Sequence, residues 1–239
     1  MQVYNLLLNE LKIINPKNNN NTLIRFIYLM NYTTTNTIQK LKDSLALDLP
    51  GQHFQNLMSP VEAHEKYRIV PKDHKVACVM ALIHPKPDGQ LYITYIERAS
   101  SHPDDKHAGQ IGFPGGKLEE EDESLVICAL REVEEELGLK MKDIEVLGEL
   151  TSLYVFASNF LVYPFVGYLD YEPKYIPQIE EVAGVIEVPL SLLMDSKYKT
   201  SKKMKLAAGP KLLVPGYNVD GYFLWGATAM ISSELEELL

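Results

Sequence analysis

The chain has 239 residues, which suits one domain with or without an appendage, and its 46% hydrophobic content permits a sizeable core. Its net charge of −9 argues against a protein that wraps nucleic acid by charge alone. Two cysteines exclude a disulfide framework and a zinc cluster and favour a reducing cytoplasm, and no apolar run is long enough to predict a membrane span.

The first 36 residues are predicted to form a poorly ordered extension, and residues 37–239 to form the folded domain. Asn18 to Asn21 and Thr33 to Thr35 give this stretch a polar composition that seldom packs, and its start lacks the basic residues of a signal peptide. Two alternatives stay open: a short helix at residues 3–14 that docks on the domain, and Met30 as the true start of translation.

The remaining pattern mixes helices and strands without strict alternation and without an internal repeat, which indicates an α/β or α+β fold. Pro87-Asp88-Gly89 is a turn signal, so the two strands beside it are expected to form a hairpin. In chain order we expect a helix at 38–47, strands at 75–83 and 91–97, a polar loop at 100–112, a break at 113–116, a helix at 123–137 closed by Gly138, strands at 144–150, 161–169 and 182–188, a short helix from Pro189 to Leu193, a strand at 222–225 and a helix at 227–238.

The excess negative charge is local. Residues 118–136 hold nine acids and a single base, Arg131. On a helical wheel Val126, Ala129, Leu130, Val133 and Leu137 form one apolar stripe, whereas Glu132, Glu135 and Glu136 share an adjoining wedge and Glu134 lies apart.

Three carboxylates in one wedge repel one another, and acids near a helix C-terminus also oppose its dipole. A cation would relieve both effects, and three oxygen ligands suit Mg²⁺ or Mn²⁺ with sites left for water and phosphate. The alternative is a solvated acidic face, the usual meaning of a charge run, and spacing alone leaves the two interpretations balanced.

The run Arg131-Glu132-Val133-Glu134-Glu135-Glu136-Leu137-Gly138-Leu139 resembles the second half of the Nudix box at every specified position. Glu123 stands at the box distance before Arg131. Gly116 lies one residue too early, and Lys117 occupies the strict glycine position. One extra residue in this loop, with an Asp such as Asp122 near the displaced acid, is similar to the coenzyme A pyrophosphatase branch of the family. The similarity extends over roughly Ile38 to Leu239.

The resemblance implies an α/β/α sandwich around a mixed β-sheet and divalent-metal-dependent hydrolysis of a nucleoside diphosphate derivative. It implies Glu132, Glu135 and Glu136 as metal ligands, with Glu132 and Glu135 also counted as catalytic. Arg131 is expected to pair with Glu123 or Asp122 and to position the ligand helix. Gly115 and Gly116 would allow the turn and a close backbone approach to phosphate or metal.

The remaining site residues are expectations of lower weight. The resemblance leaves the general base open between a box glutamate and an acid on a distant loop. Glu181, with Glu180 beside it, is the best distant candidate, although a solvated acidic pair explains both equally well. Arg98 would bind a substrate phosphate through its planar fork, and His107 and Gln110 would line the site. Cys128 is expected to be a small core residue.

The substrate implied by the branch is coenzyme A or acyl-coenzyme A. The sequence motif typical of that branch is kept at Arg98-Ala99, Gly109 and residues 113–116. Asp105, next to Lys106, stands where the motif has a second Arg, and the loop is two residues longer than in the motif. ADP-ribose or another nucleoside diphosphate derivative is the first alternative, and a non-catalytic nucleotide sensor the second. The expected partner is a small nucleotide in the cytoplasm, with no nucleic acid and no membrane, and a homodimer is left open.

Overall fold

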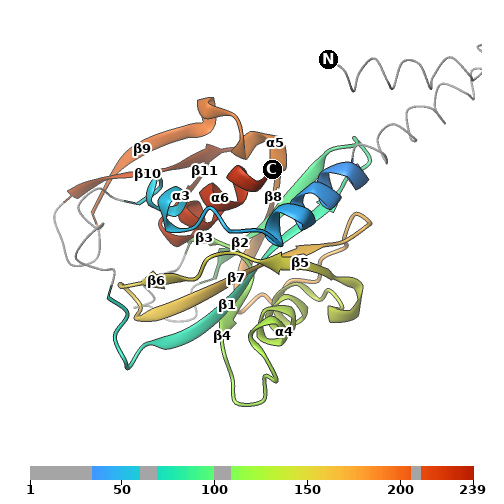
Figure 1. Ribbon diagram of the computed structural model, residues 1–239, viewed down its shortest axis with the longest axis horizontal. Coiled ribbons are helices and arrows are strands. Elements are labelled where there is room, and N and C mark those ends of the chain that lie inside the picture. The colour runs from blue at the N-terminus through green and yellow to red at the C-terminus, as the bar shows by residue number, and fades with distance from the viewer. Residues whose placement is uncertain (1–33, 60–68, 100–108, 206–210) are drawn as a thin grey trace, which may run out of the picture.

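The computed structural model describes residues 34–59, 69–99, 109–205 and 211–239 (Figure 1). Within these residues the centre is an eight-stranded mixed sheet of order β3-β2-β1-β7-β5, to which β4, β6 and β8 add beside β1, β7 and β2. Strands β1 and β7 run parallel, whereas β1 and β2 form the predicted antiparallel hairpin. The strands of this sheet are β1 (Lys75–Pro85), β2 (Leu91–Arg98), β3 (Ile111–Gly112), β4 (Gly115–Lys117), β5 (Glu145–Glu149), β6 (Leu153–Val155), β7 (Phe160–Tyr168) and β8 (Val182–Pro189).

A smaller antiparallel sheet and the helices complete the described part of the chain. Its strands are β9 (Lys199–Lys205), β10 (Lys211–Val219) and β11 (Tyr222–Trp225). The helices are residues 34–45, α3 (Gln52–Asn56), α4 (Leu125–Leu137), α5 (Leu190–Leu193) and α6 (Ala227–Leu238), with 3₁₀ turns at Met141–Asp143 and Ser196–Tyr198.

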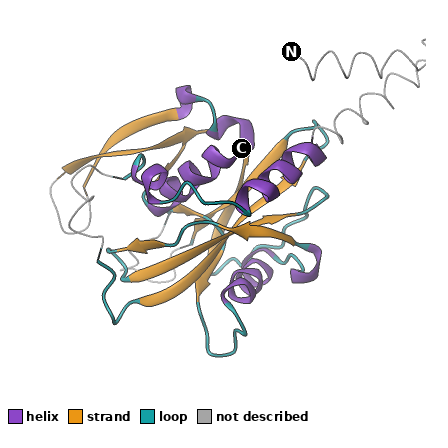
Figure 2. Cartoon of the chain, in the orientation of Figure 1, coloured by secondary structure: helices purple, strands orange, loops and turns teal. Residues whose placement is uncertain are grey.

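Alternating residues of β1 divide the apolar interior into two layers. Met80 and Leu82 pack with α4 on one face of the sheet, whereas Ala81 and Ile83 belong to the core shared with α6 and the helix at 34–45. Figure 2 shows the helices on both sides of the strands. The predicted α/β/α sandwich around a mixed sheet is therefore confirmed.

Helix α4 has the boundaries that its capping residues dictate. The side chain of Ser124 accepts a hydrogen bond from the Ile127 amide at 3.3 Å, so the helix begins at Leu125 and not at Glu123. Gly138 ends it in the left-handed conformation, with φ of 70°, as its sequence position predicted.

Several strands were missed by the sequence patterns. The expected break at residues 113–116 contains the start of β4, which pairs with β1 through Gly115, Gly116 and Lys117. The end of the expected polar loop at 100–112 forms the short strand β3, which pairs with β2. Strands β6, β9 and β10 and helix α3 were also not predicted. The lysines of β9 suit an exposed edge strand, but its sequence has no regular apolar alternation.

The N-terminal boundary shifts slightly. Residues 34–36, expected in the extension, are helical, and the rest of the extension with its asparagine run lies outside the described residues. In the described part of the chain, no helix has the length and apolar character needed to cross a bilayer.

Candidate active site

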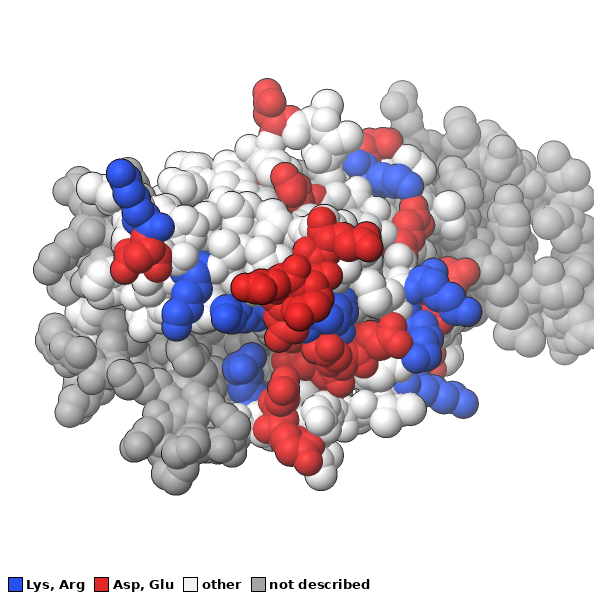
Figure 3. All heavy atoms as spheres, turned by 90° about the horizontal axis from the view of Figure 1, so that it is seen from below, with Lys and Arg blue, Asp and Glu red and all other residues white. Residues whose placement is uncertain are grey.

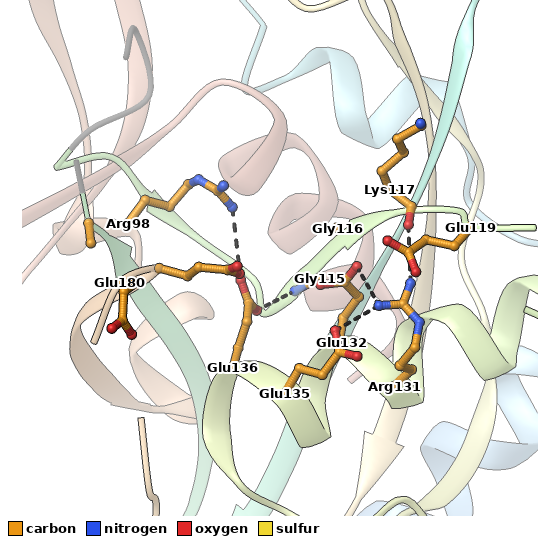
Figure 4. A pocket seen from close by; sticks show the side chains of 12 residues that line it. Arg98, Gly115, Gly116, Lys117, Glu119, Arg131, Glu132, Glu135, Glu136 and Glu180 are labelled. Carbon is orange, nitrogen blue, oxygen red and sulfur yellow. Dashed lines mark hydrogen bonds and ion pairs between the residues drawn. The ribbon is translucent and has the colours of Figure 1, made fainter. Parts of the chain in front are cut away.

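A pocket of about 320 Å³ opens beside the face of α4 that carries Glu132, Glu135 and Glu136. Acidic side chains gather in one band across this face, with basic side chains on either side (Figure 3). Two arginines and six glutamates line the pocket, as the close view in Figure 4 illustrates. The full lining is Arg98, Ala99, Gly115, Gly116, Lys117, Glu119, Arg131, Glu132, Glu135, Glu136, Glu180 and Glu181.

Two of the α4 carboxylates are buried. Glu132 is 8% exposed and Glu136 is 1% exposed. Burial raises the pKa of Glu136 to about 8, although the Gly115 amide donates to Glu136 Oε2 at 2.8 Å and Arg98 lies 4.0 Å away. Burial also raises the pKa of Glu132, against the opposing effect of Arg131. In both carboxyl groups the effect of burial therefore outweighs that of the nearby arginine.

Arg131 joins the loop before α4 to the carboxylates on it. Its guanidinium donates to both oxygens of Asp122, with Nε–Oδ1 at 2.8 Å and Nη2–Oδ2 at 2.9 Å. Nη1 reaches Glu132 at 3.1 Å and Glu135 at 2.8 Å. The hydrogen bond from Arg131 holds the pKa of Asp122 down to about 2. Arg131 thus fixes both the loop and the exposed edge of the carboxylate wedge.

This pairing corrects the register assigned to the box. Asp122 is the partner of Arg131, whereas Glu123 is exposed and makes no ion pair among the described residues. Five residues separate Gly116 from Asp122, so the glycine spacing is the strict one. The extra residue lies between the acid and Arg131, and Lys117 does not replace the box glycine.

The two glycines are required by close packing. A Cβ on Gly115, where φ is 149°, would collide with the carbonyl of Cys78, and one on Gly116 would collide with the carboxylate of Glu132. The backbone of β4 can therefore pass directly over the buried carboxylates.

The other positions of α4 lie where the wheel put them. Glu134 points away from the pocket and pairs with Lys140 at 2.6 Å. Ala129, Leu130, Val133 and Leu137 are buried, and Cys128 is a buried core residue as expected.

The opposite wall comes from the loop between β7 and β8 and from the end of β2. Glu180 and Glu181 line the pocket from this loop, and Arg98 points toward Glu136 (Figure 4). The Ala99 amide donates to the Glu181 carbonyl at 2.8 Å, which ties the two segments together. Residues more than 40 positions apart in the chain thus face one another across the pocket.

Of two further expected site residues, one lies outside the described residues and the other is not brought into the pocket. His107 lies outside the described residues. Gln110 is not part of the lining, and its carbonyl accepts from the Arg98 amide at 3.0 Å. Conversely, the pocket is also lined by three residues that were not predicted: Ala99, Lys117 and Glu119. In the sequence, Glu119 looks like one member of a solvated acidic run. The ammonium group of Lys117 is directed away from the carboxylates (Figure 4).

The donor set suits a hard divalent cation, although the side chains do not form a closed cage as they stand. Among the described residues, no group of three His, Cys, Asp or Glu side chains is arranged to hold a metal ion. Glu132 and Glu135 turn to Arg131, and Glu136 turns to the Gly115 amide. Carboxylate oxygens are nevertheless the donors that Mg²⁺ or Mn²⁺ prefers, and the charge of a bound cation would lower the raised pKa values of Glu132 and Glu136.

Comparison with known proteins places this geometry in one family. The sequence matches the NUDIX domain over residues 73–206. It is 35% identical over 162 residues to the "Uncharacterized Nudix hydrolase NudL" of Yersinia pestis, an alignment covering 67% of this chain and 78% of that protein, and NudL of Yersinia pseudotuberculosis matches equally. Among solved structures, the NUDIX domain of Shewanella oneidensis NrtR complexed with ADP ribose is 25% identical over 56% of this chain and 85% of that chain, with a TM-score of 0.41. A MutT/nudix family protein from Enterococcus faecalis is 16% identical over 78% of this chain and 70% of that one, with a TM-score of 0.43.

The matched segment contains both walls of the pocket, from Arg98 through the box on α4 to Glu181. The mixed sheet with helices on both faces agrees with the fold that the sequence led us to expect. The chain belongs to the Nudix hydrolase family, whose members act on nucleoside diphosphate derivatives and generally use divalent metal ions.

Proposed function

We propose that this enzyme hydrolyses the diphosphate linkage of coenzyme A or acyl-coenzyme A. The products would be adenosine 3′,5′-bisphosphate and phosphopantetheine or its acyl derivative. The observation that carries the proposal is the loop before α4, in which Asp122 takes the Arg131 pairing and the extra residue follows it. That variation of the box, together with Arg98-Ala99 and residues 113–116, is the pattern that resembles the coenzyme A pyrophosphatase branch.

We assign the metal site to Glu132, Glu135 and Glu136, with Mg²⁺ or Mn²⁺ as the ion. When bound, the ion would lower the pKa of an attacking water and offset charge that develops on phosphorus. The chain contributes the carboxylates and holds them in place through Arg131. The absence of side chains at Gly115 and Gly116 would let their backbone approach the metal ion or a substrate phosphate closely.

Glu181 is proposed as the general base and Arg98 as a phosphate ligand. Glu181 is close enough to Glu132 and Glu136 to raise the pKa of both, so a water between the two walls would lie near it. The carboxylate of Glu180 is directed away from α4 (Figure 4). The Arg98 side chain is 41% exposed, and within the described part of the chain its ion-pair partner, Glu136, is 4.0 Å away, so its fork can turn toward a substrate anion.

ADP-ribose is the alternative substrate, and the sequence supplies the reason. Asp105 stands where the branch pattern has a second Arg, and its carboxylate would repel the 3′-phosphate of coenzyme A. Lys106 could supply the missing charge, but without a bidentate fork. A sensor without turnover is less consistent with a box that keeps all of its carboxylates.

A substrate panel tests the proposal. Coenzyme A, dephospho-coenzyme A, an acyl-coenzyme A, ADP-ribose and NADH are incubated with Mg²⁺, and product masses are recorded. Coenzyme A should give the two products above, and Asp105→Arg should raise kcat/KM for coenzyme A more than for dephospho-coenzyme A. Equal rates on those two substrates with faster cleavage of ADP-ribose would favour the alternative, and no product from any substrate would favour the sensor.

A further inference from the structure

A second polar cluster lies on the same face of the sheet as α4, beyond the C-terminal end of that helix. The hydroxyl of Tyr175 is 2.9 Å from Thr94 Oγ1, 3.2 Å from His84 Nε2 and 3.2 Å from Glu187 Oε1. Thr94 pairs in register with Leu82, which packs against α4, and with Glu187 on the next strand. Three strands of the sheet therefore converge on one hydroxyl of the β7–β8 loop.

The polar groups of this cluster are largely buried and hydrogen-bonded to one another. Thr94 and His84 are both 0% exposed, so Tyr175 supplies hydrogen-bonding partners that water does not. Glu187 also pairs with Lys86 at 2.5 Å. Burial alone would raise the pKa of Glu187, but hydrogen bonds from His84 and Lys86 outweigh burial and lower it to about 2.

The chain that follows Tyr175 runs along the end of α4 into the pocket. The Ile176 amide donates to the Leu137 carbonyl at 2.8 Å, and the Gln178 amide donates to the Glu136 carbonyl at 2.9 Å. These bonds satisfy the last carbonyls of the helix that carries the metal ligands. Two residues after Gln178 the same loop delivers Glu180, and then Glu181, to the pocket.

Apolar burial does not hold this stretch in place. Ile176 is 74% exposed and Ile179 is 77% exposed, and no side chain from 176 to 181 is buried. The next buried anchor is Val182, at the start of β8. The position of this stretch therefore depends on Tyr175 and the buried Pro173 at one end, on Val182 at the other, and on backbone hydrogen bonds that include the one from the Ala99 amide to the Glu181 carbonyl.

We propose that Tyr175 is a positioning residue for the hydrolysis: through its hydroxyl, the sheet fixes the loop that caps α4 and carries Glu180 and Glu181 into the pocket. The inference rests on the proposed function only in taking these carboxylates to serve hydrolysis. Tyr175 itself is outside the pocket lining and touches no reacting group.

Tyr175→Phe removes the hydroxyl and keeps the ring. We expect kcat on the best substrate to fall about 10-fold with KM changed less than about 3-fold, because misplaced catalytic groups affect the transition state more than binding. Tyr171→Phe is the matched control, since Tyr171 lies on the same loop, is 41% exposed, and reaches Asp143 only at 3.5 Å. Thr94→Val should show part of the loss, and Thr94→Ser, which keeps a hydroxyl, should restore it.

A double-mutant cycle separates positioning from general stability. In a Glu180→Gln/Glu181→Gln background, Tyr175→Phe should lower kcat by less than about 2-fold, because the groups it positions are already disabled. An undiminished effect in that background, or no effect of Tyr175→Phe in the wild type, would overturn the inference.

Amide hydrogen exchange of the free protein tests the same inference without catalysis. Exchange at Ile176 and Gln178 should speed up about 10-fold or more in Tyr175→Phe and stay unchanged in Tyr171→Phe, while β1 amides remain protected in both. Unchanged exchange at these two amides would refute the positioning role. If the wild type cleaves no substrate, the proposed function fails, and the exchange result still decides whether Tyr175 fixes the loop.

Discussion

The buried carboxyl of Glu136 should make the metal-free protein less stable as pH rises. Its pKa is about 8 in the folded state, against an ordinary value of 4.5, so between these values the folded state holds a proton that the unfolded chain releases. Each pH unit with such a difference costs about 1.4 kcal/mol. The ceiling between pH 4.5 and pH 8 is therefore roughly 5 kcal/mol, and local relaxation should reduce the observed loss to about 2–4 kcal/mol.

Glu136→Gln removes this charge and keeps an oxygen that can accept from the Gly115 amide. Urea denaturation in the presence of a chelator should show the variant close to wild type at pH 5 and more stable by about 2–4 kcal/mol at pH 8. Glu134→Gln, on the exposed side of the same helix, is the control and should keep the wild-type pH slope. Equal slopes for Glu136→Gln and wild type would show that Glu136 is not the group whose ionisation is suppressed.

Three further outcomes follow from the same geometry. Glu135→Gln should lower kcat by roughly 10²-fold, the scale expected for losing a major electrostatic group, and turnover that survives complete removal of divalent metal would contradict this assignment. Asp122→Asn should destabilise the protein by about 2 kcal/mol and weaken catalysis, whereas Glu123→Gln should have little effect on either. If denaturation assays show the larger loss for Glu123→Gln, Glu123 and not Asp122 is the acid of the box. A chain that starts at Met30 should keep its melting temperature and activity. A chain that starts at Leu49 should lose on the order of 5 kcal/mol of unfolding free energy, because it lacks the three buried apolar side chains of the helix at 34–45. A large drop in the melting temperature of the chain that starts at Met30 would show that the first residues dock on the domain.

Local sequence features predicted most of the elements near the site. The β1–β2 hairpin, β11 and α6 lie where turn signals and periodicity placed them, and Gly138 ends α4 as expected. Strands β3, β4, β6, β9 and β10 were missed, because strands without a clear apolar alternation owe their conformation to a partner strand. The pattern of one segment does not contain that partner.

The sequence by itself predicted the residues proposed for the metal site. Helical spacing put Glu132, Glu135 and Glu136 in one wedge beside the apolar stripe, and the resemblance to the Nudix box suggested that this wedge binds a metal ion. Arg131 and the glycine pair were identified from the same motif.

Only the tertiary structure decided which acid Arg131 holds, which carboxylates are buried, and how the β7–β8 loop reaches the pocket. Asp122 and Glu123 are adjacent in the sequence, and just one of them lies within reach of the guanidinium once the loop is folded. The pKa of Glu136 is raised because the folded chain buries its carboxyl group, against the lowering effect of the Gly115 hydrogen bond. We infer that the place of Glu181 depends on the contacts that Tyr175 makes with three strands. Burial and long-range hydrogen bonds are properties of packed surfaces, so they arise only when segments distant in the chain come together.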